Sequence, residues 1–131
     1  MQPSARKPTT RVIIADDDPN VSRLLGYHLK TWRVDHSVAL NKKELLELFE
    51  RGEPADMLLL DVRFGESDGL ELIRDIRQRC PNLPIVVITA YGTIDLAISA
   101  IKSGARDFLV KPIDSNRLKS LIDEAIETRD S

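Results

Sequence analysis

Cysteine is almost absent from this sequence, since Cys80 is the single one among 131 residues. One thiol excludes an internal disulfide framework and is typical of proteins in a reducing cytoplasm, where we expect this chain to reside. No apolar run approaches the roughly 20 residues that a membrane-spanning helix needs. The N-terminus lacks the hydrophobic segment of a secretory signal, so we interpret residues 1–10 as a flexible basic arm.

An excess of charge of one sign is also lacking. The 19 Lys and Arg residues and 21 Asp and Glu residues give a formal net charge of -2. A near-neutral chain has neither the basic surface that binds nucleic acid nor a polybasic patch for membranes, so we expect this domain to bind neither directly. With 42% hydrophobic residues the chain can form one folded core, and its length fits a single domain.

Five short apolar segments have the length and composition of β-strands. They are rich in β-branched and aliphatic residues, and several end at Asp, Thr or Pro. The predicted strands are residues 11–15, 34–38, 56–61, 84–89 and 107–110. The third and fourth carry continuous apolar runs, as expected of strands that are buried on both faces of a sheet.

Segments with helical periodicity follow each predicted strand. Asp18 before Pro19, and Asn41 three residues before Glu44, are typical of helix N-termini. Asp114 is placed to open the last helix. In the fourth helix, the apolar residues that repeat at helical spacing are Ile94, Ala97, Ile98 and Ile101.

This alternation of strand and helix, repeated five times, predicts an α/β fold. We expect a single doubly wound, five-stranded parallel sheet with helices on both faces. Right-handed crossovers leave few topologies, of which the common small one is the flavodoxin-like (βα)5 arrangement with strand order 2-1-3-4-5. Ligands of such sheets bind beyond the carboxyl ends of the strands, at the switch point between the first and third strands.

Acidic residues gather at that predicted switch point. Asp16 and Asp17 follow the first strand and Asp61 ends the third, so three carboxylates should meet in one small pocket. Like charges a few ångströms apart repel by about several kcal/mol at an effective dielectric near 20, and a bound divalent cation would relieve this repulsion. An all-oxygen site favours Mg²⁺, which we expect as the cofactor.

Two further strand ends carry groups suited to a phosphoryl group. The fourth strand ends at the hydroxyl of Thr89, and the fifth is followed by the ammonium of Lys111. Around one carboxylate, these groups would supply a donor and a positive charge to the oxygens of a transferred phosphoryl group. Asp61 would then be the nucleophile and form an aspartyl phosphate.

The chain resembles the receiver domain of two-component response regulators in three segments, IIADDDP, LLLDVRFGESDGL and VVITAYGTIDLAISAIKSGARDFLVKPID. The resemblance covers residues 11–127 and leaves 128–131 as a tail or the start of a linker. It is strongest to the nitrogen-regulation type, whose full-length members activate transcription. It implies that Asp61 is the phosphoacceptor and that Thr89 and Lys111 contact the phosphoryl group.

The resemblance also implies a set of metal ligands. Asp17 and Asp61 would bind Mg²⁺ directly, Asp16 would act largely through water, and the backbone carbonyl of Arg63 would complete the protein ligands. The family commonly has proline and then glycine four and five residues after the phosphoacceptor, where this chain has Gly65 and Glu66. This departure concerns the loop and not the phosphoacceptor itself.

A conformational switch is implied as well. Phosphorylation by a sensor histidine kinase would draw Thr89 inward, and Phe108 would rotate into the vacated space. The surface formed by the helix within 92–104, the strand 107–110 and the last helix would then change and control an output, which we expect to be transcription. The same surface could pair two copies of the chain. Arg63 and Tyr91 would lie at the rim and limit the access of water to the phosphate.

Two other functions share parts of this pattern. A Mg²⁺-dependent aspartyl-phosphate phosphohydrolase of the haloacid-dehalogenase type is the alternative, but that family expects a second aspartate where Arg63 stands. A flavin-binding module of the same topology needs a phosphate-binding loop after the first strand, where this chain has acidic residues that would repel a phosphate. A receiver would catalyse no reaction other than its own phosphorylation and dephosphorylation.

Overall fold

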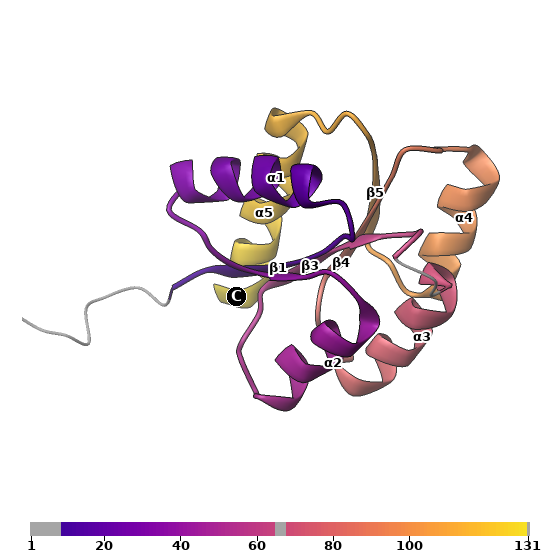
Figure 1. Ribbon diagram of the computed structural model, residues 1–131, viewed down its shortest axis with the longest axis horizontal. Helices are drawn as coiled ribbons and strands as arrows, with labels where there is room; N and C mark the ends of the chain where they lie inside the picture. Colours follow the sequence, from indigo (N-terminus) through magenta and orange to yellow (C-terminus); the bar gives the residue numbers. More distant parts are fainter. Residues whose placement is uncertain (1–8, 65–67, 131) are drawn as a thin grey trace, which may run out of the picture.

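The computed structural model describes residues 9–64 and 68–130 (Figure 1). Strands and helices alternate along the chain, as predicted. The strands are β1 (Arg11–Ala15), β2 (Asp35–Ala39), β3 (Met57–Asp61), β4 (Ile85–Thr89) and β5 (Asp107–Val110). The helices are α1 (Pro19–Thr31), α2 (Lys42–Glu50), α3 (Gly69–Arg79), α4 (Ile94–Ser103) and α5 (Ser115–Asp130). Within the described ranges, no helix has the length and apolar character needed to cross a bilayer.

The strands form one parallel sheet in the order β2-β1-β3-β4-β5, which confirms the predicted topology. Because β1 pairs with both β2 and β3, the switch point lies between β1 and β3. Ala15 of β1 is in register with Leu60 of β3. The next residues along the two strands, Asp16 and Asp61, therefore lie at the same level of the sheet edge.

Helices cover both faces of this sheet (Figure 1). α1 and α5 lie on one face, and α2, α3 and α4 lie on the other. Successive residues of β1 point into opposite layers, so that Ile14 packs toward α1 and α5 while Ile13 packs toward the other three helices. Every residue of β3 and β4 is buried, as predicted for the central strands.

The helix ends follow the predicted capping residues, with small differences. The Asp18 carboxylate accepts a hydrogen bond from Asn20 N (2.9 Å), and the Asn41 side chain accepts one from Glu44 N (2.9 Å). The Glu44 carboxylate accepts from Leu40 N (2.7 Å), whereas in an ideal capping box it would accept from the cap residue itself.

Three strands, β2, β3 and β4, begin one residue later than predicted. The Val34 N–H donates to Leu29 O in the turn that closes α1, so Val34 lies before the start of β2. Pro84 has no N–H to donate to a ladder. α5 continues to Asp130, through the first three residues of the expected tail.

The apolar stripe of α4 does not face the core. Ile94 is 80% exposed, and Ile98 and Ile101 are 47% and 46% exposed. Ala100 is the buried residue of this helix. The sequence pattern thus predicted the helix but not its orientation, because α4 presents a small residue to the sheet and its large apolar residues to solvent.

Candidate phosphoacceptor and metal site

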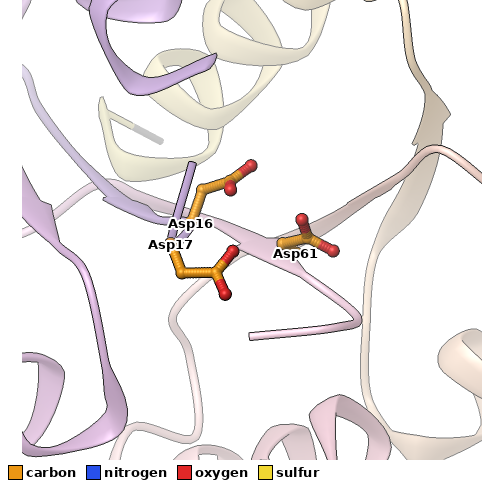
Figure 2. A group of neighbouring side chains, drawn as sticks. All are labelled: Asp16, Asp17 and Asp61. Carbon is orange, nitrogen blue, oxygen red and sulfur yellow. The ribbon is translucent and has the colours of Figure 1, made fainter. Parts of the chain in front are cut away.

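Three carboxylates meet at the carboxyl edge of the sheet (Figure 2). Asp16 and Asp17 follow β1 directly, and Asp61 is the last residue of β3. One oxygen of each lies within 4.8 Å of the other two. Asp16 is fully buried, Asp61 is 7% exposed and Asp17 is exposed. The predicted proximity is therefore confirmed, and Figure 2 shows the carboxylate of Asp17 turned toward Asp61.

The ammonium of Lys111 lies between the two buried carboxylates. Its Nζ donates a hydrogen bond to Asp61 Oδ2 (2.9 Å) and lies 2.9 Å from Asp16 Oδ2. The second contact has the distance of an ion pair but not the angles of a hydrogen bond, so Asp16 Oδ2 is a buried oxygen with no hydrogen-bond partner among the described residues. β5 brings Lys111 to this edge, where its N–H donates to Thr89 O (2.7 Å).

Burial and mutual charge change the proton affinity of these groups. Burial raises the pKa of Asp16 above 3.8; the Asp18 N–H and the Lys111 ammonium oppose this shift, and the charge of Asp61 adds to it. Burial by itself would lower the pKa of Lys111, but the contacts with Asp61 and Asp16 outweigh it and hold that pKa above 10.5. The lysine therefore stays charged at neutral pH.

Backbone amides fix the orientation of both buried carboxylates. Asp61 Oδ1 accepts from Arg63 N (2.8 Å), and Asp16 Oδ1 accepts from Asp18 N (2.9 Å). Each amide lies two residues after the aspartate that it binds, so each loop holds its own carboxylate. The Oδ2 atoms are thereby left facing the ammonium of Lys111 and the centre of the cluster.

This donor set fits a hard divalent cation. Its three carboxylates offer only oxygen, and it includes no histidine or thiol. The buried Oδ2 of Asp16 has an ion pair with Lys111 but no hydrogen-bond partner among the described residues, and a cation or its water would satisfy it. Arg63 follows the cluster in the loop after β3, and its carbonyl remains the predicted additional ligand.

Thr89 and Phe108 lie on the adjacent strands β4 and β5. Thr89 is 1% exposed, and its Oγ1 accepts from Tyr91 N (3.1 Å). Phe108 is partly buried and packs against the core between the sheet and α2, α3 and α4. A Cβ built on Gly92 would lie 2.3 Å from Val110 Cγ2 and 3.3 Å from Phe108 Cε1, so the loop after Thr89 packs directly on both side chains.

One contact at the rim was not predicted from the sequence. The guanidinium carbon of Arg63 lies 4.3 Å from the centroid of the Tyr91 ring, which is a cation–π geometry. The rim positions of both residues were expected, but not their contact with each other. The signal was available, since each residue stands two positions after the end of one of two paired strands. The departure at Gly65 and Glu66 lies outside the described residues.

Residues 12–123 match the family model described as the response regulator receiver domain. The chain is 44% identical over 119 residues to the response regulator protein PilR of Pseudomonas aeruginosa, a match that covers 91% of this chain and 26% of that protein. It is 35% identical over 115 residues to the transcriptional regulatory protein ZraR of Klebsiella oxytoca, covering 88% and 26%. The chain thus spans about a quarter of the length of these curated relatives.

Solved structures of response regulators also resemble this chain. A response regulator from Thermotoga maritima matches with a TM-score of 0.82 and 30% identity over 92% of this chain and 99% of that one. NtrX from Brucella abortus, solved in complex with ADP, gives a TM-score of 0.82 and 30% identity over 92% of this chain and 27% of that one. Together with the curated relatives, these matches confirm the nitrogen-regulation type predicted from the sequence. The chain belongs to the family of two-component response regulator receiver domains, which are signalling domains.

Proposed function

We propose that this domain accepts a phosphoryl group on Asp61 from a sensor histidine kinase in the cytoplasm. The observation that carries the proposal is the position of the Lys111 ammonium, 2.9 Å from carboxylate oxygens at the ends of two different strands. A partly buried lysine held by two aspartates provides a fixed positive charge beside the nucleophile. Such a charge stabilises the oxygens of a transferred phosphoryl group.

The transfer step needs a nucleophile and a leaving group. A carboxylate oxygen of Asp61 forms a bond to phosphorus while the phosphorus–nitrogen bond of a phosphohistidine breaks. The histidine nitrogen keeps the electron pair of that bond. Lys111 is placed to donate to a phosphoryl oxygen, and the Thr89 hydroxyl can donate to another once it turns toward the phosphate.

Asp16, Asp17, Asp61 and the carbonyl of Arg63 would hold Mg²⁺ at this site. When bound, the ion would supply positive charge that offsets the carboxylates and the phosphoryl oxygens. The backbone N–H groups of Asp18 and Arg63 keep one oxygen of each buried carboxylate in place, so the side chains are oriented before the phosphoryl group arrives.

The phosphorylation signal would pass through Thr89 to the exposed surface of α4, β5 and α5. Movement of the buried Thr89 hydroxyl toward the phosphate would open space that the partly buried Phe108 ring can enter. Converting a rare state into the dominant one requires about 5 kcal/mol of differential binding, which several charge-assisted hydrogen bonds can supply.

The exposed surface carries an apolar patch that suits a macromolecular partner. Its members on and beside α4 and β5 are Tyr91, Ile94, Ile98, Ile101 and Val110, all between 46% and 80% exposed. Apolar residues that are exposed singly are ordinary, but a contiguous group of them typically marks an interaction site. We infer that this patch pairs two copies of the domain and that its change of shape controls transcription, the process that the name of ZraR gives for that relative.

Incubation with acetyl phosphate and Mg²⁺, followed by intact-protein mass spectrometry, tests the proposal. We expect the gain of one phosphoryl group, its loss in Asp61→Asn, and its retention in Asp18→Asn, which changes a neighbouring exposed aspartate that caps α1. Continuous release of phosphate over many turnovers, without a lasting mass gain, would instead favour the phosphohydrolase.

A further inference from the structure

α4 is attached to the rest of the domain mainly at its C-terminal end. Ile94 and Asp95 in its first turn are exposed, whereas Ala100 is fully buried. Ala105, just after the helix, is also part of the core on this side of the sheet. The N-terminal end of α4 follows the loop from Thr89, so the free end is the one nearer the phosphoacceptor edge (Figure 1).

Arg77 of α3 makes the polar contacts at the attached end. Its Nη2 donates to Gly104 O at 2.6 Å, and its Nη1 donates to Leu83 O at 2.7 Å. Nη1 also lies within hydrogen-bond distance of Pro81 O (3.0 Å) and Cys80 O (3.2 Å). One guanidinium therefore joins the end of α3, the loop before β4 and the end of α4.

The residue at the end of α4 permits this close approach. Gly104 has a φ of +122°, a conformation that favours glycine. A Cβ built there would lie 3.2 Å from Arg77 Nε. A cation at this place is also favourable, because the last carbonyls of a helix carry partial negative charge and lack partners within the helix.

We propose that Arg77 is a positioning residue that fixes the C-terminal end of α4, so that the helix responds to phosphorylation by moving its N-terminal end. The contacts of Arg77 lie at the amino edge of the sheet, where β4 and β5 begin, and the phosphoacceptor lies at the carboxyl edge. Loss of the guanidinium frees both ends of α4 and weakens the coupling without touching the phosphoryl site. The response to phosphorylation rests on the proposed function, whereas the attachment itself does not.

Hydrogen–deuterium exchange of the full chain tests both parts. The reporting amides are those of Gly104 and Ala105, which donate to Ile101 O and Ala100 O at 3.0 Å. In Arg77→Ala we expect them to exchange about tenfold faster than in wild type, the change that follows from losing one hydrogen bond to a charged group. Arg77→Lys keeps the charge with a single nitrogen, so a smaller increase is expected, and this variant decides the outcome if Arg77→Ala does not fold.

Arg74 supplies the matched controls. It lies on the same helix and is exposed, and its side chain makes no hydrogen bond or ion pair with any described residue. Arg74→Ala and Arg74→Lys should leave exchange at residues 104 and 105 unchanged. Equal exchange in the Arg77 and Arg74 variants would overturn the proposal.

Phosphorylation provides the second readout. With acetyl phosphate and Mg²⁺, we expect exchange in residues 94–97 of the wild type to change, and this change to shrink at least twofold in Arg77→Lys while the rate of phosphorylation stays the same. An undiminished change in Arg77→Lys would refute the role of Arg77 in coupling. If the wild type takes up no phosphoryl group, the proposed function fails, and the exchange at residues 104 and 105 still tests the attachment.

Discussion

Lys111→Met is the substitution that most directly perturbs the charge balance of the site. It removes the ammonium that lies 2.9 Å from oxygens of both Asp16 and Asp61 and keeps a side chain of similar length. Two nearly buried carboxylates then face each other without a cation. We expect a folded but less stable protein in the absence of Mg²⁺.

The size of this effect follows from burial. Removing one partner of a buried ion pair costs about 3–5 kcal/mol. The side chain of Lys111 is 19% exposed, so water screens part of the cluster and we expect about 3 kcal/mol, the lower limit. Unfolding entropy of about 2.1 cal/mol/K per residue gives about 0.28 kcal/mol/K for this chain, so the melting temperature should fall by about 11 °C.

Thermal unfolding followed by circular dichroism in EDTA measures this change. Lys102→Met is the control, because Lys102 is exposed on α4 and forms no ion pair among the described residues. It should shift stability by less than about 0.5 kcal/mol. Adding Mg²⁺ should raise the melting temperature of Lys111→Met more than that of wild type, since the ammonium no longer offsets the carboxylates. Equal melting temperatures of Lys111→Met and Lys102→Met in EDTA would show that the Lys111 ammonium does not stabilise the folded state by offsetting the two carboxylates.

Three further predictions concern the same edge of the sheet. The pKa of Lys111 is raised in the folded state, so its charge stabilises the fold fully below pH 10.5, and this contribution is lost as the pH rises through the pKa of the folded state. The difference in melting temperature between wild type and Lys111→Met should therefore be constant from pH 7 to 10 and shrink above pH 10. A difference that already shrinks below pH 9 would contradict a raised pKa. Arg63→Ala or Tyr91→Ala should speed the decay of the phosphorylated protein about two- to fivefold, since an exposed cation–π contact contributes about 0.5–1 kcal/mol. Unchanged decay in both variants would contradict the prediction that these two side chains limit the access of water to the phosphate. Gly92→Ala should lower the free energy of unfolding by about 1–3 kcal/mol, because the new methyl group would collide with Val110. Urea unfolding of the double variant Gly92→Ala/Val110→Ala should show that the second substitution restores much of this loss. If the losses from the two single substitutions simply add in the double variant, the collision is excluded.

The sheet and the site could be predicted from the sequence because each depends on local signals. Continuous apolar runs identify β3 and β4, and capping residues such as Asn41 mark the helix starts. In a parallel sheet of known strand order, the carboxyl ends of neighbouring strands lie at the same edge. The predicted order therefore placed Asp16 and Asp61 close together, as the structure shows them.

Features that depend on the rotation of a helix or on long-range contacts could not be predicted in this way. The stripe of isoleucines on α4 has the spacing of a buried face, yet the helix turns Ala100 inward. Periodicity shows that a face exists but not what it contacts. The contact of Arg77 with Gly104 joins residues 27 positions apart, and no local signal marks it. The contact of Arg63 with Tyr91 joins residues 28 positions apart and can be expected only once the pairing of β3 with β4 is known.

Chemical mapping of the modified residue decides whether Asp61 is the phosphoacceptor. Borohydride reduces an acyl phosphate on aspartate to homoserine, which tandem mass spectrometry of peptides locates at a single position. After treatment with acetyl phosphate and Mg²⁺, we expect reduction at residue 61 alone, and none in EDTA. Reduction at Asp16 or Asp17, or at residue 61 without Mg²⁺ at the same rate, would contradict it.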